Sequence, residues 1–582
     1  MNNVKRIFDI PEFQAKNFPL DVALASKEDN QWKTYSTKEY LDRANLISKG
    51  LLKLGIKPGD KIAMISNNRP EWNIMDIGIL QIGAIDVPVY PTITEKDYKF
   101  IFNDAQVKLC IVSDKELLNK VQNIIDDIPS LTDIYTFNKI SGAKHWTEIS
   151  DLGKNDPNSE LDDLKKSINE DDLATLIYTS GTTGTPKGVM LSHKNIVQNA
   201  IGSKPRLPIS SNEVALSFLP VCHVYERMIL YLYQLTGVSI YFAESLETIK
   251  ENIVDIRPHV FTAVPRLLEK VYDGIINKGA AAGGLKAKIF SWAVGLTESF
   301  EYGKHPSFQR KIADKLVYSK IREGLGGRIK AIASGSAALQ PRLARFFHAI
   351  GLPVYEGYGL TETSPVVSVN AASSGVVFGS VGKKLDNVEL KIAEDGEILT
   401  KGVCLMMGYY KREDITNEVI DTEGWFHTGD IGTLDSNGFL KITDRKKEIF
   451  KTSGGKYVAP QLMENKFKES RFIEQIMVIG ENQKHPAALL VPSFDFVQNW
   501  CKSNNISIQD NESICKNDKV ISKIKEEVNL YNTNFSKWEQ VKKIELINQE
   551  FTVESGELTP TLKFKRKIIL EKYKDLIAKI YN

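Results

Sequence analysis

A cluster of glycines and hydroxyl side chains directly follows a run of apolar residues in the first third of the chain. The run at 174–178 leads into Thr179-Ser-Gly-Thr-Thr-Gly-Thr-Pro-Lys-Gly188. Glycines let the backbone bend and approach a ligand closely, and the N–H groups, hydroxyls and lysine of such a turn suit a polyphosphate. We therefore expect a phosphate-binding loop, with a plain surface loop as the alternative. Its candidate residues are Thr179, Ser180, Gly181, Thr182, Thr183, Gly184 and Lys187.

This loop differs from that of the P-loop kinases and ATPases. Their signature places a Ser or Thr directly after Gly-Lys, where the hydroxyl binds magnesium. Here Pro186 precedes Lys187 and Gly188 follows it. The phosphates must therefore be bound in a different way.

The elements that must position this loop alternate between strands and helices. Continuous apolar runs predict strands that are covered on both faces, at residues 61–66, 109–113, 174–178 and 330–334. Helical patterns at 37–54, 195–201 and 341–350 lie between them. This alternation predicts an α/β fold with parallel-rich sheets, in which loops at the strand ends carry the chemistry.

The pattern changes after residue 381. Short strands separated by turn signals, such as Asp435-Ser-Asn-Gly438, predict a small antiparallel or barrel-like β subdomain. Beyond residue 444 the chain is more basic and mixes strands at 476–480 and 488–491 with helices. We therefore predict a large N-terminal domain at 1–444 and a smaller, mobile α+β lid domain at 445–582.

Composition narrows the class of protein. A chain of 582 residues exceeds what one hydrophobic core usually organises. Its 75 Lys and Arg nearly balance 73 Asp and Glu, so no global field attracts nucleic acid, and we expect no nucleic-acid partner. Five scattered cysteines and the lack of a signal-peptide pattern favour a reducing cytoplasm.

Two further stretches have a predicted structure. The longest mostly uncharged stretch, 228–243, is too short to cross a bilayer, so it predicts a buried helix, a glycine turn and a strand. The small-residue cluster at 279–284 predicts a flexible loop.

Four motifs resemble, in order, those of the adenylate-forming superfamily, which includes acyl-CoA synthetases, luciferases and peptide-synthetase adenylation domains. Tyr178-Thr-Ser-Gly-Thr-Thr-Gly-Thr-Pro-Lys-Gly188 resembles its phosphate loop, and Tyr355-Glu-Gly-Tyr-Gly-Leu-Thr-Glu-Thr363 its adenine and magnesium motif. Gly424-Trp-Phe-His-Thr-Gly-Asp430 resembles its ribose motif, and Asp444-Arg-Lys-Lys447 its hinge.

Within that superfamily the chain is most similar to long-chain fatty acyl-CoA synthetases. The similarity lies in residues 422–447, in the tail Gly556-Glu-Leu-Thr-Pro-Thr-Leu-Lys-Phe-Lys-Arg566 and in Leu219-Pro-Val-Cys-His-Val-Tyr-Glu-Arg227, which resembles a segment beside the acyl tunnel. The resemblance implies ATP-dependent ligation of a long-chain fatty acid to coenzyme A through an acyl-adenylate. ATP, Mg²⁺ and coenzyme A are the implied cofactor and substrates.

The resemblance also assigns an adenine site and a metal site. Tyr358, flanked by Gly359, is expected to stack on adenine, with a buried core tyrosine as the alternative. Gly335 and Ser336 resemble the opposite adenine wall. Glu362 and Thr182 are the implied magnesium contacts, and Thr361 and Lys187 are implied to contact phosphate.

The remaining assignments concern the ribose and the lid. Asp430 is expected to accept hydrogen bonds from the ribose hydroxyls, with a turn or cap aspartate as the alternative. Arg445 is implied to reach the ribose or the α-phosphate, and Lys447 is the implied hinge. His223 is a candidate for the acyl or thiol passage, although a lone histidine is often a structural polar group.

Lys563 is the candidate mobile catalytic lysine. The family's usual glycine before that lysine is replaced by Leu562, and Lys565 lies two residues further on. In an extended strand both lysines would share one face. Lys565 therefore remains an alternative, as does a basic solvated face without a catalytic role.

Several functions stay open at this level. The rivals are an acyl-AMP ligase that loads a carrier protein, a shorter-chain synthetase, a luciferase, and a nucleotide-binding scaffold without catalysis. Chain-length preference, peripheral membrane contact and a homo-oligomer are not decided by the sequence.

Overall fold

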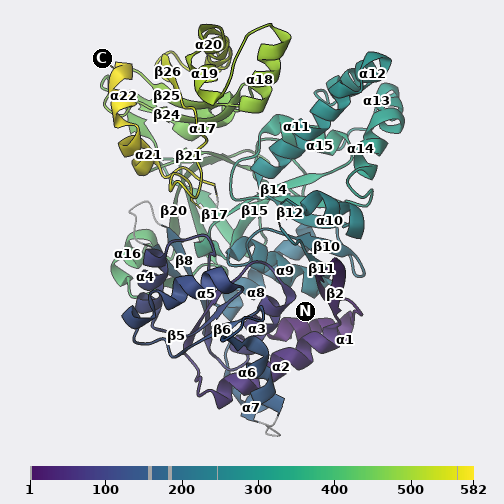
Figure 1. Ribbon diagram of the computed structural model, residues 1–582, viewed down its shortest axis with the longest axis vertical. Helices are drawn as coiled ribbons and strands as arrows, with labels where there is room; N and C mark the ends of the chain where they lie inside the picture. Colours follow the sequence, from purple (N-terminus) through teal and green to yellow (C-terminus); the bar gives the residue numbers. More distant parts are fainter. Residues whose placement is uncertain (1–2, 155–159, 181–185, 246, 560–561, 582) are drawn as a thin grey trace. The chain divides into compact units, whose positions relative to one another are not determined.

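The computed structural model describes residues 3–154, 160–180, 186–245, 247–559 and 562–581. The chain forms two compact units (Figure 1). The first comprises Met1–Leu390, Thr400–Phe426 and Gly438–Leu440, and the second comprises Lys391–Leu399, His427–Asn437 and Lys441–Asn582. The predicted boundary at 444/445 stays a prediction.

The first unit contains an eight-stranded sheet of order β19-β9-β8-β4-β3-β5-β6-β7. Its strands are β3 (Lys61–Ile65), β4 (Ile85–Val89), β5 (Val107–Val112), β6 (Asp133–Thr136), β7 (Lys144–His145), β8 (Leu173–Ser180), β9 (Pro186–Ser192) and β19 (Gly408–Tyr409). The pairs from β8 to β7 are parallel, whereas β9 runs antiparallel to both β8 and β19. Parallel strands of this kind are buried on both faces, as the apolar runs predict.

A second, nine-stranded sheet has the order β16-β15-β14-β13-β12-β10-β11-β1-β2. Its strands are β1 (Leu24–Glu28), β2 (Gln31–Tyr35), β10 (Val214–Ser217), β11 (Ser239–Phe242), β12 (Val260–Ala263), β13 (Ala331–Ser334), β14 (Val354–Gly359), β15 (Val366–Val369) and β16 (Lys383–Lys384). In the order of the sheet, the neighbours from β14 through β13, β12, β10 and β11 to β1 pair in parallel. Antiparallel strands are added at the two edges, β2 at one and β15 with β16 at the other. The prediction of an α/β fold with parallel-rich sheets is confirmed.

Helices connect these strands and cover the sheets. In the N-terminal half they are α1 (Asp9–Asn17), α2 (Thr37–Lys53), α3 (Pro70–Leu80), α4 (Glu95–Ala105), α5 (Lys115–Gln122), α6 (Trp146–Lys154), α7 (Glu160–Ser167), α8 (His193–Ser203) and α9 (Val224–Thr236). Further on they are α10 (Ile249–Ile256), α11 (Pro265–Ala281), α12 (Gly284–Gly295), α13 (Phe308–Ala313), α14 (Ser319–Glu323), α15 (Pro341–Ala349) and α16 (Glu413–Val419). The 3₁₀ turns η1 (Ile125–Asp127), η2 (Lys204–Arg206) and η4 (Thr361–Thr363) and the π-helical segment η3 (Asp314–Tyr318) complete the unit.

Helix α9 is almost completely buried. It ends at Gly237 in the left-handed conformation and leads into β11, so residues 228–243 form the predicted helix, turn and strand. Among the described residues, no helix is both long enough and apolar enough to reach across a bilayer.

The cluster at 279–284 is not the predicted flexible loop. Gly279 lies in the last turn of α11, and only residues 282–283 separate that helix from α12. A Cβ on Gly279 would lie 2.3 Å from the Phe290 ring. The glycine therefore permits close packing of two helices, which small-residue composition alone does not distinguish from a loop.

A small four-stranded sheet of order β17-β18-β20-β21 confirms the predicted β subdomain. Its strands are β17 (Val388–Ile392), β18 (Glu397–Gly402), β20 (Phe426–Leu434) and β21 (Leu440–Arg445). The expected turn signals lie between them, because residues 393–396 and 435–439 separate successive strands.

The second unit contains a three-stranded sheet with a core on each face. The strands are β24 (Ile473–Ile479), β25 (Ala487–Pro492) and β26 (Lys543–Leu546), beside a hairpin of β22 (Phe450–Lys451) and β23 (Tyr457–Val458). Alternate residues of β24 and β25 enter two separate clusters, as the two-residue period of a strand requires. The covering helices are α17 (Pro460–Phe467), α18 (Phe494–Ser503), α19 (Asn511–Lys516), α20 (Asp518–Asn532), α21 (Arg566–Lys572) and α22 (Lys574–Tyr581).

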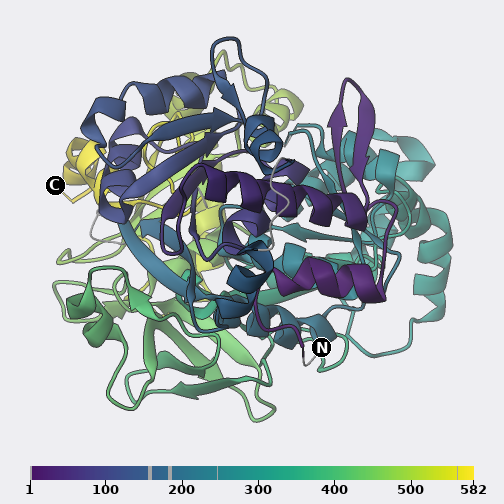
Figure 2. The same cartoon turned by 90° about the horizontal axis from the view of Figure 1, so that it is seen from below.

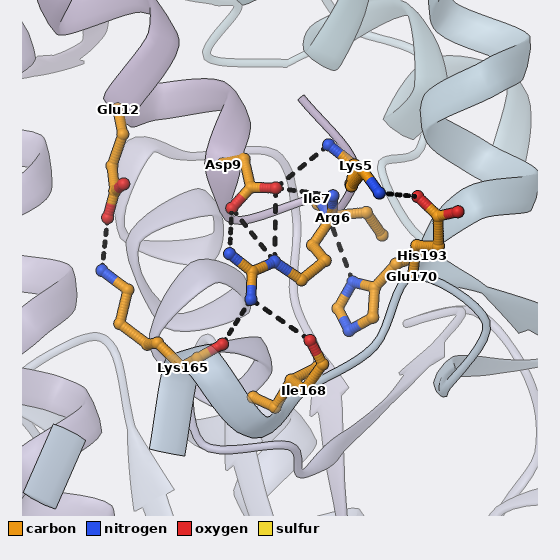
Figure 3. Close-up of polar contacts among 9 residues, drawn as sticks. All are labelled: Lys5, Arg6, Ile7, Asp9, Glu12, Lys165, Ile168, Glu170 and His193. Atoms are coloured by element: carbon orange, nitrogen blue, oxygen red, sulfur yellow. Dashed lines mark hydrogen bonds and ion pairs between the residues drawn. The ribbon is translucent and has the colours of Figure 1, made fainter. Parts of the chain in front are cut away.

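The N-terminal segment of the first unit closes over the start of α8 (Figure 3). The Arg6 guanidinium pairs with Asp9, with an Nη2–Oδ1 distance of 2.8 Å, and its Nη1 donates to the carbonyl oxygens of Lys165 and Ile168. The Ile7 N–H donates to His193 Nδ1 at 3.3 Å. Burial lowers the pKa of His193 to about 3, so the ring stays neutral and accepts this bond. Figure 3 shows Arg6 at the centre of these contacts.

We predict that Arg6→Ala lowers the free energy of unfolding by about 1–3 kcal/mol, because it removes the guanidinium that pairs with Asp9 and leaves two carbonyl groups without that donor. Urea unfolding monitored by circular dichroism measures the change. The matched control is Lys38→Ala, which removes an exposed ion pair with Asp42 and should change stability by less than about 1 kcal/mol. Equal effects of the two substitutions would contradict the prediction.

Candidate active site

The predicted phosphate loop is flanked by an antiparallel strand pair. Thr179 of β8 pairs with Lys187 of β9, and Ser180 pairs with Pro186. Gly181, Thr182, Thr183 and Gly184 lie outside the described residues. The pairing of β8 with β9 therefore brings Thr179, Ser180 and Lys187 together at the carboxyl end of β8.

This arrangement separates the loop from that of a P-loop protein. A P-loop leads from a strand into a helix, whereas here the chain returns along β8 as strand β9, and helix α8 begins only at His193. Lys187 accordingly projects from a strand. The sequence argument against a P-loop is supported by the fold.

Lys187 lies beside an aromatic residue that the sequence analysis missed. Its ammonium group is 5.0 Å from the centroid of the Tyr409 ring. The Tyr409 hydroxyl donates to Glu362 Oε1 at 2.8 Å. Three residues from distant parts of the sequence thus form one group: the expected phosphate ligand, a tyrosine and the expected metal ligand.

Backbone pairing fixes this group. Tyr409 pairs with Val189 in β9, two residues from Lys187 and therefore on the same face of that strand. The Met406 N–H donates to the carbonyl oxygen of Glu362 at 2.8 Å, which ties the same segment to η4. Burial and, next, the Glu362 carboxylate raise the pKa of Tyr409 above its ordinary value. The phenol therefore stays protonated and donates a hydrogen bond to Glu362. The sequence offers only a Gly-Tyr-Tyr run as a signal for Tyr409.

The expected adenine motif forms the end of β14 and the turn that follows. Tyr358 pairs with Ser368 of β15, and its side chain is 9% exposed, as the alternative of a buried tyrosine also predicts. A Cβ on Gly359 would lie 1.8 Å from the Pro365 carbonyl oxygen, so no larger residue fits. Thr361 is buried and Glu362 is half-buried in η4.

The expected opposite adenine wall follows the neighbouring strand β13. Gly335 is buried, and Ser336 has a φ of 71°. Glu356 of β14 accepts a hydrogen bond from the Leu339 N–H at 2.9 Å and thereby joins the two expected walls. Burial raises the pKa of Glu356 to about 8, and the Leu339 N–H partly offsets this. The sequence analysis did not single out Glu356.

The two expected ribose contacts meet in the second unit. Arg445 Nε lies 3.0 Å from Asp430 Oδ1, and the Asp430 side chain is buried. Asp430 stands inside β20, so it is neither a turn nor a cap residue. The adjacent Asp444 is also buried, which raises its pKa to about 7.

The expected hinge is linked to the expected catalytic segment by one half-buried arginine, Arg566. Lys447 is exposed in the turn after β21. The next residue, Glu448, pairs with Arg566 at 2.8 Å, and Arg566 also pairs with Glu464 of α17 at 2.7 Å. Arg566 begins α21, three residues after Lys563. Within this unit, the segment before α21 is therefore held against the turn that contains Lys447.

Lys563 and Lys565 flank Phe564, which forms an isolated antiparallel bridge with Leu558. Neither lysine lies in a longer strand, so their shared face stays a prediction. The Lys563 N–H donates to Thr559 Oγ1 at 3.1 Å, and Lys565 is the residue before α21. Lys563 is exposed and Lys565 is half-buried. Leu562 has a φ of 60°, in the left-handed region that favours glycine. Leu562 thus has a backbone conformation that favours glycine, the residue that the family pattern has at this position.

His223 is the N-cap residue of helix α9. Its Nδ1 accepts a hydrogen bond from the Tyr225 N–H at 3.1 Å, a capping role that needs no ligand. The same segment ends in Arg227, which is 1% exposed and pairs with Asp76 at 2.5 Å and Asp86 at 3.0 Å. These contacts hold α9 against α3 and β4. The passage role of His223 stays a prediction.

The donor set limits what kind of metal site fits. The described residues contain no cluster of three or more His, Cys, Asp or Glu side chains suited to a metal ion. Mg²⁺ usually binds through one or two carboxylates together with substrate phosphates. The single carboxylate of Glu362, which shares Tyr409 as a neighbour with Lys187, fits that mode.

Family models match both parts of the chain. Residues 11–410 match the AMP-binding enzyme family, and residues 447–582 match the C-terminal domain of AMP-binding enzymes. The second match begins at Lys447, the residue expected to be the hinge.

Curated relatives match over nearly the whole length. A long-chain-fatty-acid–CoA ligase of Mycobacterium bovis, FadD15, is 34% identical over 572 residues, covering 95% of this chain and 93% of the relative. The peroxisomal long-chain acyl-CoA synthetase 6 of Arabidopsis thaliana is 33% identical over 589 residues, covering 95% of this chain and 82% of that relative.

A solved structure shares the fold. The adenylation domain of carboxylic acid reductase from Segniliparus rugosus, in complex with AMP and a co-purified carboxylic acid, matches with a TM-score of 0.78 and 22% identity, covering 99% of this chain and 94% of that chain. Together with the family matches and the order of the four motifs, these findings identify the chain as a member of the AMP-binding superfamily of adenylate-forming, acyl-activating enzymes.

Proposed function

We propose that this enzyme ligates a long-chain fatty acid to coenzyme A through an acyl-adenylate, releasing AMP and pyrophosphate. The observation that carries the proposal is the 34% identity to a long-chain-fatty-acid–CoA ligase across almost the full length of both chains. The segment at 219–227 supports the proposal, because its sequence resembles the segment that lies beside the acyl tunnel in long-chain synthetases.

The first half-reaction replaces a poor leaving group with a good one. A carboxylate oxygen of the fatty acid attacks the α-phosphorus of ATP, the bond to the β-phosphate oxygen breaks, and pyrophosphate leaves. We assign Lys187, Thr179, Ser180 and Thr361 to the phosphates, because cationic and hydroxyl donors stabilise the charge that develops there. The reacting oxygen carries no proton, so this step requires no general base.

Tyr409 positions two of these groups in our proposal. Its hydroxyl donates to Glu362, and its ring lies beside the Lys187 ammonium, so it holds the carboxylate and the cation near each other. Glu362 would hold Mg²⁺, with Thr182 as a second contact. When bound, this ion neutralises charge on the phosphates and on the departing pyrophosphate.

The second half-reaction transfers the acyl group. The coenzyme A sulfur attacks the acyl carbonyl carbon, its thiol proton passes to solvent, the bond to the AMP oxygen breaks, and AMP leaves. We propose that Lys563 serves only adenylate formation. Rotation of the lid at Lys447 then carries Lys563 out of the site and opens a channel for the thiol, as in the family that the chain resembles. His223 is proposed to line the acyl or thiol passage.

Nucleotide contacts and location complete the proposal. Tyr358, Gly359, Gly335 and Ser336 are assigned to adenine, and Asp430 with Arg445 to ribose. A reducing cytoplasmic location is proposed because all five cysteines are unpaired.

The proposed function predicts a specific product pattern. With ATP, Mg²⁺ and acids of graded chain length, pyrophosphate release should rise with chain length, and coenzyme A should convert the adenylates to thioesters. Coupled pyrophosphate assays and mass spectrometry of the products measure both outcomes. Pyrophosphate release that never gives a thioester would favour loading of a carrier protein, and a preference for short acids would favour a shorter-chain synthetase.

We predict that Lys563→Ala slows adenylate formation about 100–1,000-fold, the usual effect of removing a group that stabilises transition-state charge. The variant should still form thioester from supplied acyl-adenylate at near the normal rate. Pyrophosphate exchange measures the first half-reaction, and thioester formation measures the second. Lys565→Ala is the matched control and should leave both rates unchanged; the opposite result would assign the role to Lys565.

We also propose that Glu356 is a positioning residue for the expected adenine walls. Glu356→Ala should raise the KM for ATP with a smaller change in kcat, because it removes the acceptor of the Leu339 N–H. Glu356→Gln, which keeps an acceptor oxygen, should restore the KM. A KM that is unchanged in the alanine variant would contradict this role.

The raised pKa of Glu356 gives a second readout. The pKa of Glu356 is about 8 in the folded state, against a usual 4.5. Between these two pH values Glu356 keeps its proton in the folded state but releases it in the unfolded state. This contribution to stability therefore falls as pH rises from about 5 to 8, at up to ~1.4 kcal/mol per pH unit. Urea unfolding across this range should show a shallower decline for Glu356→Gln than for the wild type.

A further inference from the structure

A two-faced helix lies on the first unit, outside the proposed catalytic groups. Helices α13, η3 and α14 form one continuous helix over residues 308–323. Ala313, Val317 and Tyr318 are buried in the core on one side, and the Tyr318 hydroxyl donates to the Ala293 carbonyl oxygen of α12 at 2.5 Å. The core therefore accounts for one apolar face of this helix.

The opposite face is also apolar, but it faces solvent. Phe308 is 77% exposed, Ile312 38% and Leu316 44%. A spacing of four residues places these side chains along one stripe of the helix. Packing in the unit therefore does not explain why three large apolar residues occupy this stripe.

Helix α12, which packs against the same helix, continues this feature. Leu285 is 73% exposed and Trp292 is 39% exposed. Figures 1 and 2 show α12 and α13 side by side at one edge of the first unit. Five of the eighteen large apolar side chains that are exposed among the described residues thus fall within residues 284–323. Such concentration marks an interaction surface rather than scattered surface residues.

The charge of this segment is strongly biased. Residues 284–323 contain eight Lys and Arg against four Asp and Glu, whereas the whole chain has a net charge of only +2. Lys288 lies between Leu285 and Trp292 in sequence, and Lys311 and Lys315 directly precede Ile312 and Leu316. All three lysines are exposed, and the described residues give none of them an ion-pair partner.

We propose that the exposed face of residues 284–323, here called the basic apolar face, docks on a lipid bilayer that contains anionic lipids. Large apolar side chains enter the boundary between headgroups and acyl chains, while the flexible lysine stems keep their ammonium groups at the level of the lipid phosphates. A second copy of the chain fits less well, because a twofold contact would set the same lysines against each other. This surface does not depend on which acid the enzyme activates.

Co-sedimentation of the full chain with phosphatidylcholine vesicles, with and without phosphatidylglycerol, tests the proposal. We expect binding that requires phosphatidylglycerol and weakens as salt is added. The double variant Phe308→Ser, Leu316→Ser should bind at least about tenfold more weakly, because it removes two of the inserting groups. The double variant Lys311→Gln, Lys315→Gln should also bind more weakly and lose most of the salt dependence.

Leu530→Ser is the matched control, because Leu530 is 60% exposed on α20 in the second unit. It should bind vesicles as the wild type does. Circular dichroism melting checks that each variant folds. If the serine variant does not fold, the lysine variant still tests the proposal, because it leaves every apolar side chain in place. The proposal is overturned if the wild type does not bind anionic vesicles, if neither double variant weakens binding, or if the variants only dissociate an oligomer.

Discussion

The antiparallel pairing of β8 with β9 is the constraint on which the candidate site of the first unit depends. It turns the chain back at the phosphate loop and places Lys187 on a strand rather than at the start of a helix. The pairing of β9 with β19 then brings Tyr409 next to Lys187, and the Tyr409 hydroxyl reaches Glu362. Because each contact relies on the one before it, the cation and the carboxylate take their places through backbone hydrogen bonds rather than through mutual attraction.

The second unit uses a different kind of constraint. Arg566 holds two carboxylates, Glu448 and Glu464, at 2.8 and 2.7 Å, in a site where its own side chain is only 17% exposed. A buried ion pair adds little net stability, but the removal of one partner is costly because the other charge stays buried. Such a cluster fixes the segment before α21 to the turn after β21. It therefore ties the segment that contains Lys563 to the turn that contains Lys447, as the proposed motion of the lid as one body requires.

Much of the local structure was predictable because it has short-range causes. The strands at 61–66, 109–113 and 174–178 and the helix at 37–54 follow from apolar periodicity and capping, and the structure places them within a few residues of the predicted bounds. The prediction of a flexible loop at 279–284 was wrong, because glycine and alanine suit both a flexible loop and the tight packing of two helices. The conformation of Leu562 was also hidden, since a leucine gives no signal for a left-handed φ.

The sequence by itself determined the chemical class, because the glycines, hydroxyls and lysine of the phosphate loop and the order of four motifs are local and ordered features of the chain. Only the tertiary structure decided that Tyr409 joins Lys187 to Glu362, that Glu356 connects the two expected adenine walls, and that Arg566 links the hinge turn to the lysine segment. The physical reason is that these contacts join residues far apart in sequence. Strand pairing and burial create them, and neither leaves a periodic signal in the amino-acid order.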